Sequence, residues 1–464
     1  MRGSGSACGA RAPRRAARGL AGAICVLVLA AGTARAQPQQ QAPAEPDPLL
    51  EAAGAVAAAI APTPSAELAR HFGPHLLAAL PWERLAALTA ALHERHGAVE
   101  RLELLEREGG KGRFLFHLQD GAALPVTIVL KGEPGRIEGL WFGVARPRAD
   151  SVAAVLAELA ALPGQPGAAV LEVGARPEDD AVLHALAAER RAALGSACKL
   201  YVLGALLDEI AAGRRRWDEV VQLSEAHRSL PSGLLQDWPA GTPVTVASLA
   251  ALMIARSDNT ATDQLLALLG RERLEAQLAR MGHGAPARTL PWLATRELFL
   301  LRGDQALARR YREADLAGRR ALLQALGGRM PDPGSLPVQP QDIDAIEWFA
   351  SPRELCAAMA WLWRRTAEQE LALGRALLAI NPGPAAGEQR DWRYAGFKGG
   401  SEPGVLCLAL LLQHRGGRTF AVAASWNDPQ RALDEQAFVA LCVRLLHALA
   451  VELEAAGRGA AGER

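Results

Sequence analysis

The chain has 464 residues, half of them hydrophobic, and a formal net charge of +1 at pH 7. Nucleic-acid-binding proteins usually have a large excess of basic residues, and a net charge of +1 shows no such excess. We therefore expect no nucleic-acid partner. The length allows two to three domains, each large enough to bury its own core.

The first 36 residues have the pattern of a cleavable secretory signal. A basic start is followed by an apolar run at 19–31 and by small residues up to Ala36. Because this run is shorter than the roughly 20 residues that span a bilayer, cleavage after Ala36 is favoured over an uncleaved anchor. We therefore predict a periplasmic or secreted protein with no stable membrane span after cleavage. A linker rich in Pro and Gln follows at 37–48.

Residues 49–148 predict a small α+β domain. Residues 49–92 have the apolar spacing of helices, and segments 114–118, 125–130 and 137–144 have the pattern of antiparallel strands. This order of elements resembles the cone of the nuclear-transport-factor-2 and ketosteroid-isomerase family. The segment carries no catalytic motif, and the resemblance would imply a pocket for a lipid- or steroid-like molecule.

Residues 149–456 predict a second domain, with strands at both ends of a mainly helical middle. Strands this far apart in the sequence imply one sheet assembled from distant segments, and a short disordered tail is expected at 457–464. The expected helices are 151–162, 196–213, 247–255, 262–269 and 434–452, the expected strands are 168–173, 181–188, 393–397, 405–412 and 419–425, and the main loops are 327–341 and 381–389.

Lysine is rare in this chain and occurs at only four positions, 111, 131, 199 and 398, whereas all other basic residues are arginine. Arginine keeps its proton in a protein, but a buried lysine can lose its proton and act as a base. Lys199 opens the apolar run 200–203 and lies one helical turn after Ser196, on the same face. The plain alternative is a serine N-cap followed by a solvated lysine, which fits a buried helix poorly.

Two further motifs follow in the chain. Ser257-Asp258-Asn259 lies between two apolar helical stretches, and its plain alternative is a capped turn between helices. Lys398-Gly399-Gly400-Ser401 lies between two expected strands, and its plain alternative is a hairpin with a glycine turn. Because two of the three motifs use the rare lysines, we interpret them together as parts of one site.

In this order the motifs resemble the signatures S-x-x-K, S-D-N and K-T-G of the serine β-lactamases and penicillin-binding proteins. The resemblance covers about residues 149–456 and implies a β-lactamase-like α+β fold, with an antiparallel sheet flanked by a helical subdomain. The two-domain order, TRELF at 295–299 and EWFASPREL at 347–355 look most similar to the serine hydrolases of the clavulanate-biosynthesis-cluster type.

The resemblance also implies roles for the motif residues. Ser196 is the nucleophile that forms an acyl-enzyme, and Lys199 is the base that a weak serine nucleophile needs. Ser257 relays a proton to the leaving group. Asn259 binds the substrate amide or the Lys199 ammonium, and Lys398 supplies positive charge near Ser257 and toward an anionic substrate group.

The third motif departs from the family pattern. Gly399 and Gly400 form K-G-G in place of K-T-G, so the hydroxyl that usually meets the substrate carboxylate is missing, although Ser401 can compensate. The oxyanion hole implied by the resemblance consists of the backbone N–H groups of Ser196 and Ser401.

A deacylating base is also not evident. Class A β-lactamases use a loop glutamate followed by an Asn, and the nearest acid to the corresponding position is Glu297, which lacks the Asn. We interpret Glu297 as an exposed residue that opens a helix, and acylation is therefore better supported than deacylation.

Cysteines and histidines give no rival site. The cysteines left after signal cleavage are widely spaced and predict buried free thiols, and the histidines show no metal-ligand spacing. We expect no metal and no cofactor. The expected function is a serine hydrolase acting on a small-molecule β-lactam, ester or peptide-like substrate, with esterase activity second. The alternatives are an acylatable penicillin-binding or sensor protein without efficient turnover, and a D,D-peptidase.

Overall fold

The computed structural model describes residues 47–132, 135–147, 150–284, 286–387 and 391–462. The predicted signal at 1–36, its cleavage site after Ala36, and the linker up to residue 46 lie outside the described residues.

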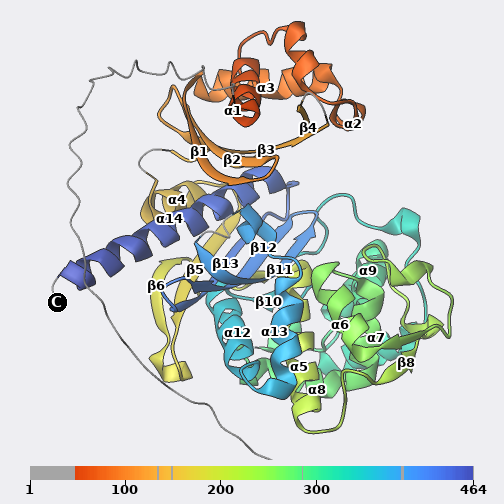
Figure 1. Ribbon diagram of the computed structural model, residues 1–464. Helices are drawn as coiled ribbons and strands as arrows, with labels where there is room; N and C mark the ends of the chain where they lie inside the picture. The colour runs from red at the N-terminus through yellow and green to blue at the C-terminus, as the bar shows by residue number, and fades with distance from the viewer. Residues whose placement is uncertain (1–46, 133–134, 148–149, 285, 388–390, 463–464) are drawn as a thin grey trace, which may run out of the picture. The chain divides into compact units, whose positions relative to one another are not determined.

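The N-terminal part of the described chain is a four-stranded antiparallel sheet in the order β1-β2-β3-β4, with three helices (Figure 1). Alternate residues of β2, such as Phe114 and Phe116, point into a core that Leu49 and Val56 of α1 complete. The expected α+β arrangement is confirmed, whereas the nuclear-transport-factor-2 likeness stays a prediction. The elements are α1 Pro48–Ala59, α2 Pro74–Ala79, α3 Trp82–His96, β1 Val99–Glu108, β2 Lys111–Leu118, β3 Ala123–Lys131 and β4 Arg136–Phe142.

Strand β1 is not predicted by the sequence. Its residues, VERLELLERE, are all exposed or partly exposed, although they pair with β2 along its length. A strand with no fully buried face gives little alternation of apolar and polar residues, so periodicity does not detect it.

The remaining part contains a five-stranded antiparallel sheet in the order β11-β12-β13-β5-β6. Strand β5 pairs with β13, for example through Val170 and Val422, which confirms a sheet assembled from distant segments. The strands are β5 Gln165–Val173, β6 Ala181–Leu186, β11 Trp392–Glu402, β12 Val405–His414 and β13 Thr419–Asn427.

Helices cover both faces of this sheet, which explains why β12 and β13 are almost continuously apolar (Figure 1). Helices α4 (Val152–Ala160) and α14 (Glu435–Gly462) pack on one face, and α12 (Pro352–Arg365) packs on the other. The helices of the adjoining helical region are α5 Lys199–Ala211, α6 Val246–Ala255, α7 Asn259–Leu269, α8 Arg271–Arg280, α9 Thr295–Gly303, α10 Gln305–Glu313, α11 Leu316–Leu326 and α13 Ala372–Ala379, and the short strands are β7 Ala192–Ala193, β8 Val220–Gln222, β9 Pro243–Thr245 and β10 Phe349–Ala350.

Two differences from the expected element boundaries bear on the site and on the C-terminus. The motif at 398–401 lies inside β11, because the ladder with β12 continues to the pair Glu402–Val405, and the turn falls at Pro403-Gly404. Helix α14 continues to Gly462, so the expected disordered tail is wrong for residues 457–462. Three of these six residues are glycine, which has a low helix propensity and explains why the sequence predicts no helix there.

Helix α14 is long and apolar enough to cross a membrane by length and composition, over Glu435–Ala456. However, 56% of its apolar window is buried inside the protein, where Phe438 and Leu446 pack in the core beneath the sheet. Burial of this kind is typical of a core helix.

Candidate active site

Ser196 lies in a single 3₁₀ turn, Gly195–Cys198, that leads directly into α5. The helix expected from Ser196 onward therefore becomes a true α-helix only at Lys199. Gly195 has a φ of +50°, a left-handed conformation that glycine adopts at little cost. This sharp turn places the serine at the end of a buried helix.

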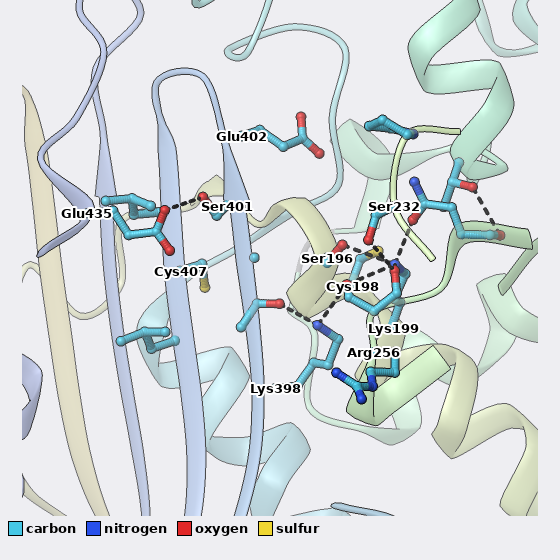
Figure 2. Close-up of a pocket in the computed structure, with 18 of the residues that line it drawn as sticks. Ser196, Cys198, Lys199, Ser232, Arg256, Lys398, Ser401, Glu402, Cys407 and Glu435 are labelled. Carbon is cyan, nitrogen blue, oxygen red and sulfur yellow. Dashed lines mark hydrogen bonds between the residues drawn. The ribbon is translucent and has the colours of Figure 1, made fainter. Parts of the chain in front are cut away.

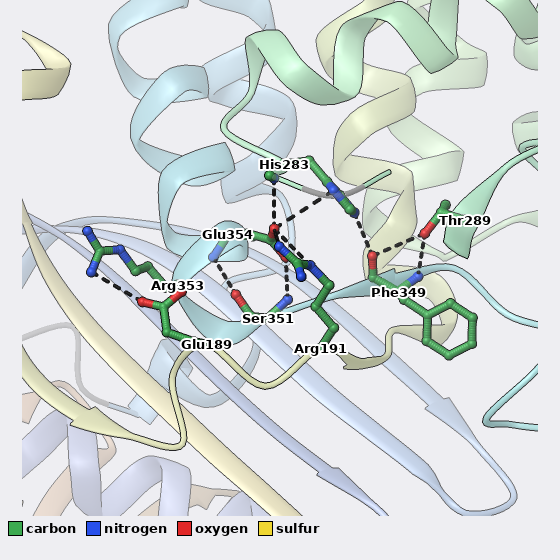
Figure 3. A network of polar contacts seen from close by, with 9 residues as sticks. Glu189, Arg191, His283, Thr289, Phe349, Ser351, Arg353 and Glu354 are labelled. Carbon is green, nitrogen blue, oxygen red and sulfur yellow. Dashed lines mark hydrogen bonds and ion pairs between the residues drawn. The ribbon is translucent and has the colours of Figure 1, made fainter. Parts of the chain in front are cut away.

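A polar network holds the chain just before this turn (Figure 3). The Arg191 guanidinium donates to the Glu354 carboxylate over distances of 2.6–3.1 Å. The same carboxylate accepts the backbone N–H groups of Ser351 and Gly284, each at 2.8 Å. Since Glu354 belongs to α12, the network ties the segment that carries Ser196 to the helix beneath the sheet.

Lys199 is completely buried, and its Nζ lies within hydrogen-bond distance of four oxygen atoms (Figure 2). The backbone oxygen of Ser257 and Asn259 Oδ1 are nearest, at 2.6 and 2.7 Å, and these atoms only accept. The hydroxyls of Ser196 and Ser257 lie at 3.1 Å and can also donate. A neutral amine at this position can therefore donate to the two acceptors and accept the proton of the Ser196 hydroxyl.

The Ser257-Asp258-Asn259 segment is shaped by its own side chains. Ser257 adopts a φ of +56°, which is uncommon for a residue other than glycine. Asp258 caps α7 by accepting the N–H of Ala261 at 2.8 Å. Asn259 donates from Nδ2 to the Leu230 oxygen at 2.9 Å, which directs its Oδ1 toward the buried amine. The predicted capping turn and the predicted site are thus the same structure.

Strand β11 brings the third motif to the same place. Lys398 is 3% exposed, and its Nζ lies 3.1 Å from Ser257 Oγ, so the Ser257 hydroxyl lies between two amines. Strand β11 is the edge strand of the sheet and lies directly against the turn Gly195–Cys198, which we call the nucleophile turn after the predicted role of Ser196. A Cβ atom on Gly400 would overlap the Leu194 oxygen and lie 2.7 Å from the Ser196 nitrogen, which explains a glycine here.

All the residues that the sequence predicts for the site line one cavity of about 510 Å³ (Figure 2). The structure thus brings together three segments that span more than two hundred positions of the sequence. Ser401 was expected to replace the hydroxyl that K-G-G lacks. In the structure, its hydroxyl donates to Glu435 Oε2 at 3.0 Å. The set in the cavity is Ser196, Lys199, Ser257, Asn259, Lys398, Gly399, Gly400 and Ser401.

Burial lowers the pKa of both lysines. The pKa of Lys199 falls to about 8, chiefly because burial disfavours the charged amine. The pKa of Lys398 falls to about 7, because of burial and of the nearby charge on Lys199. Two amines this close titrate as a pair, so a neutral amine is available near physiological pH.

Glu297 does not line the cavity. It opens α9 as expected, but it is only 4% exposed, so the expectation of an exposed residue is wrong. Arg271 Nη2 donates to both of its carboxylate oxygens, at 2.7 and 3.0 Å, and the Ala294 N–H donates to one of them at 2.7 Å. The sequence does not show this burial because Arg271 comes from another helix.

Replacing Glu297 with Gln is therefore expected to destabilise the fold by about 3 kcal/mol, because Arg271 loses a largely buried partner. Acylation at Ser196 should be unchanged. Urea unfolding measures the first effect and a burst assay the second. Glu83→Gln, an exposed first-turn acid of α3, is the control. A loss of acylation without a loss of stability would contradict this structural role.

The cavity also contains residues that the motifs do not mark. Ser232 donates to the backbone oxygen of Ser257 at 3.0 Å, and Arg256 and Glu402 each adjoin a motif residue in the sequence. For Arg256 and Glu402, adjacency to a motif residue was the only indication in the sequence that they belong to the site. The four cysteines that the structure describes are free and buried, as expected. Across the described ranges, no cluster of three His, Cys, Asp or Glu side chains could hold a metal ion.

The fold and the cavity together define a class of protein, an α+β protein with a serine–lysine pair beneath the edge strand of an antiparallel sheet. A family model described as "Beta-lactamase enzyme family" matches residues 148–448, and the chain belongs to this family. A search of curated proteins found no match.

Several solved structures are similar to this chain. A β-lactamase from Sphaerobacter thermophilus DSM 20745 is 21% identical, with 64% of this chain and 95% of that chain covered and a TM-score of 0.46. The L158E mutant of PBP-A, an acyl-enzyme complex with penicillin G, is 16% identical, with 65% and 96% covered and a TM-score of 0.45. An ancestral class A β-lactamase is 20% identical, with 65% and 98% covered and a TM-score of 0.44.

Proposed function

We propose that the protein is a serine hydrolase that forms an acyl-enzyme on Ser196 with β-lactams or with related amides and esters. One observation carries this proposal: a buried, pKa-lowered Lys199 amine lies 3.1 Å from the Ser196 hydroxyl inside a cavity. A serine hydroxyl is activated by an adjacent base of this kind.

The contacts support a defined acylation path. Neutral Lys199 takes the Ser196 proton while Oγ attacks the substrate carbonyl carbon. The Ser257 hydroxyl gives its proton to the leaving nitrogen or oxygen as the acyl bond breaks, and regains a proton from the Lys199 ammonium at 3.1 Å. The backbone N–H groups of Ser196 and Ser401 would stabilise the oxyanion, since preorganised donors at a developing charge lower the barrier.

The remaining residues would select the substrate. Asn259 Oδ1 accepts a hydrogen bond from the Lys199 amine. The Asn259 side chain would therefore hold that amine in place and also bind the substrate amide. The Lys398 amine lies 3.1 Å from Ser257 Oγ, and in its protonated form it would bind an anionic substrate group, whose charge would in turn favour that form. Gly399 and Gly400 leave this wall of the cavity without the usual hydroxyl, and the Ser401 hydroxyl is directed to Glu435. Esters without a carboxylate are therefore reasonable substrates beside β-lactams.

Parallel assays distinguish these substrates. Hydrolysis of the chromogenic cephalosporin nitrocefin and of a p-nitrophenyl ester would be measured with the same protein preparation, with Ser196→Ala as the blank. The proposal predicts Ser196-dependent turnover of at least one of them. Turnover of neither, together with no covalent adduct, would contradict it.

The second candidate function is an acylatable penicillin-binding or sensor protein without efficient turnover, and the engagement of Glu297 with Arg271 is the observation in its favour. The lifetime of the acyl-enzyme separates the two candidate functions. An acyl-enzyme that persists for hours would support the sensor, whereas release within seconds would support the hydrolase. Release of D-alanine from a D-Ala-D-Ala peptide would instead identify a D,D-peptidase.

The pH dependence of acylation follows from the two lowered pKa values. The base form of the Lys199 amine is required, and its pKa is about 8, with Lys398 titrating near 7. The acylation rate constant should therefore rise from pH 6 to pH 9, by nearly tenfold per unit at the acid end. Stopped-flow acylation at saturating substrate measures this profile. A rate that is constant across the range would contradict Lys199 as the base.

We place the mature protein in the periplasm or outside the cell, on the basis of the signal pattern that ends at Ala36. An exported chain that begins at Gln37 is the expected result of N-terminal sequencing. Retention of residues 1–36 in the exported fraction would contradict cleavage and would support a membrane anchor.

A further inference from the structure

A second charged cluster lies beside the nucleophile turn and takes no part in the acylation path. It joins Glu402, at the end of β11, to Arg302 of α9 and to Glu347, which precedes β10. The side chains of Arg302 and Glu402 are 2% and 10% exposed. Burial of charged groups has a desolvation cost, so a cluster of this kind in a cavity wall is a candidate for function.

Glu402 belongs to the wall of the cavity that contains Ser196 (Figure 2). A Cβ atom placed on Gly195 would lie 3.6 Å from both Cγ and Oε1 of Glu402. Because Gly195 directly precedes Ser196, the carboxylate lies against the backbone of the nucleophile turn. A side chain at position 195 would come between the Glu402 carboxylate and this backbone, whereas glycine leaves that space open.

Arg302 fixes one oxygen of this carboxylate and leaves the other available. Its Nη1 contacts Glu402 Oε2, while its Nε donates to the Ile346 oxygen at 3.1 Å. Within the part of the chain that the structure describes, no hydrogen-bond donor contacts Glu402 Oε1. One oxygen is thus held by a buried guanidinium and the other is free to bind a water.

The second acid of the cluster is Glu347, whose Oε1 lies 3.4 Å from Arg302 Nη2. Burial, together with the charge of Glu402, raises the pKa of the Glu347 carboxyl well above its usual range. Of the two acids, Glu402 makes the closer contact with the Arg302 guanidinium. Glu347 itself is not among the residues that line the cavity.

We propose that Glu402 is the general base of deacylation, a role that rests on the proposed acyl-enzyme at Ser196. Glu402 Oε1 takes a proton from a water molecule as the water oxygen attacks the acyl carbonyl carbon. The bond from that carbon to Ser196 Oγ then breaks, and Oγ takes the proton back from Glu402. The products are a carboxylic acid and free Ser196, and water is the only co-reactant.

The other acid in the cavity fits this role less well. Among the described residues that line it, Glu435 is the one other carboxylate. Glu435 is exposed and accepts the Ser401 hydroxyl at 3.0 Å, so it lies beside Ser401 and not beside the nucleophile turn (Figure 2). Glu402 therefore supplies the carboxylate that Glu297 does not.

The test separates acylation from deacylation. Glu402→Gln and Glu402→Asp would be mixed with nitrocefin, and the acyl-enzyme followed by stopped flow and by intact mass. Removing a general base slows its step by about 10²–10⁴-fold. We expect Glu402→Gln to acylate at a rate close to that of the wild type and to accumulate an adduct that decays at least 100-fold more slowly. Glu402→Asp, which keeps the charge opposite Arg302, should fall between the two.

Glu347→Gln is the matched control, because it removes the other acidic partner of Arg302 at a residue that does not line the cavity. Its adduct should decay at the wild-type rate. Decay of the Glu402→Gln and Glu402→Asp adducts at the wild-type rate would overturn the role of Glu402 and leave the hydrolase proposal intact, and so would equal slowing in Glu347→Gln. Absence of any adduct on the wild type would instead overturn the proposed function itself.

Discussion

Replacing Lys199 with Met should lower the acylation rate constant by about 10²–10⁴-fold, the range that a general base contributes. Methionine keeps the length and the burial of the side chain but cannot accept the Ser196 proton. The amine that it removes lies 3.1 Å from the hydroxyls of both Ser196 and Ser257, so the activation of the nucleophile and the proton relay are lost together. Single-turnover acylation by a β-lactam measures the effect.

Lys111→Met is the control for this variant, because Lys111 is one of the four lysines but is exposed on β2. Its acylation rate should equal that of the wild type. The assignment of Lys199 as the base would be wrong if Lys199→Met, folded by circular dichroism, acylated within threefold of the wild type.

Replacing Gly400 with Ala should have the second large effect. The added Cβ would overlap the Leu194 oxygen and lie 2.7 Å from the Ser196 nitrogen, and both are backbone atoms that cannot rotate away. Strand β11 and the nucleophile turn must therefore separate. A displacement of about 1 Å at a reacting group can reduce the rate by about 10²-fold, and overpacking destabilises a core by about 1–3 kcal/mol.

Gly167→Ala, on β5 of the same sheet, is the control for Gly400→Ala. A Cβ on Gly167 would come no closer than 3.3 Å to its neighbours. This contact is with a Pro352 side-chain carbon that needs to move by only a few tenths of an ångström, so stability from urea unfolding and acylation from stopped flow should change much less in Gly167→Ala than in Gly400→Ala. Equal effects in the two variants would show that the contact between β11 and the nucleophile turn does not position Ser196.

The local parts of the site could be predicted from the sequence because local geometry fixes them. Ser196 and Lys199 are one helical turn apart wherever the helix lies, and the apolar residues after Lys199 already indicate its burial. The sheet was also predictable, since β12 and β13 are buried on both faces and are apolar throughout. The family resemblance then supplied the expectation that the three motifs converge.

The parts that could not be predicted depend on contacts between distant segments. Glu402 reaches the nucleophile turn only because the ladder of β11 continues through the glycines, where the sequence favours a turn. Its partner Arg302 lies on α9, and no local pattern links the two. Likewise, Glu297 has the sequence of an exposed helix start, yet Arg271 of α8 makes it part of the interior.

The most direct test of the serine–lysine assignment is the intact mass of the protein after mixing with a β-lactam at pH 8 and quenching in acid at intervals from milliseconds to minutes. The wild type should gain the full mass of the β-lactam, because ring opening releases no fragment, and Ser196→Ala should remain unmodified at every interval. A wild type that stays unmodified throughout, or an equal gain of mass on Ser196→Ala, would contradict the assignment.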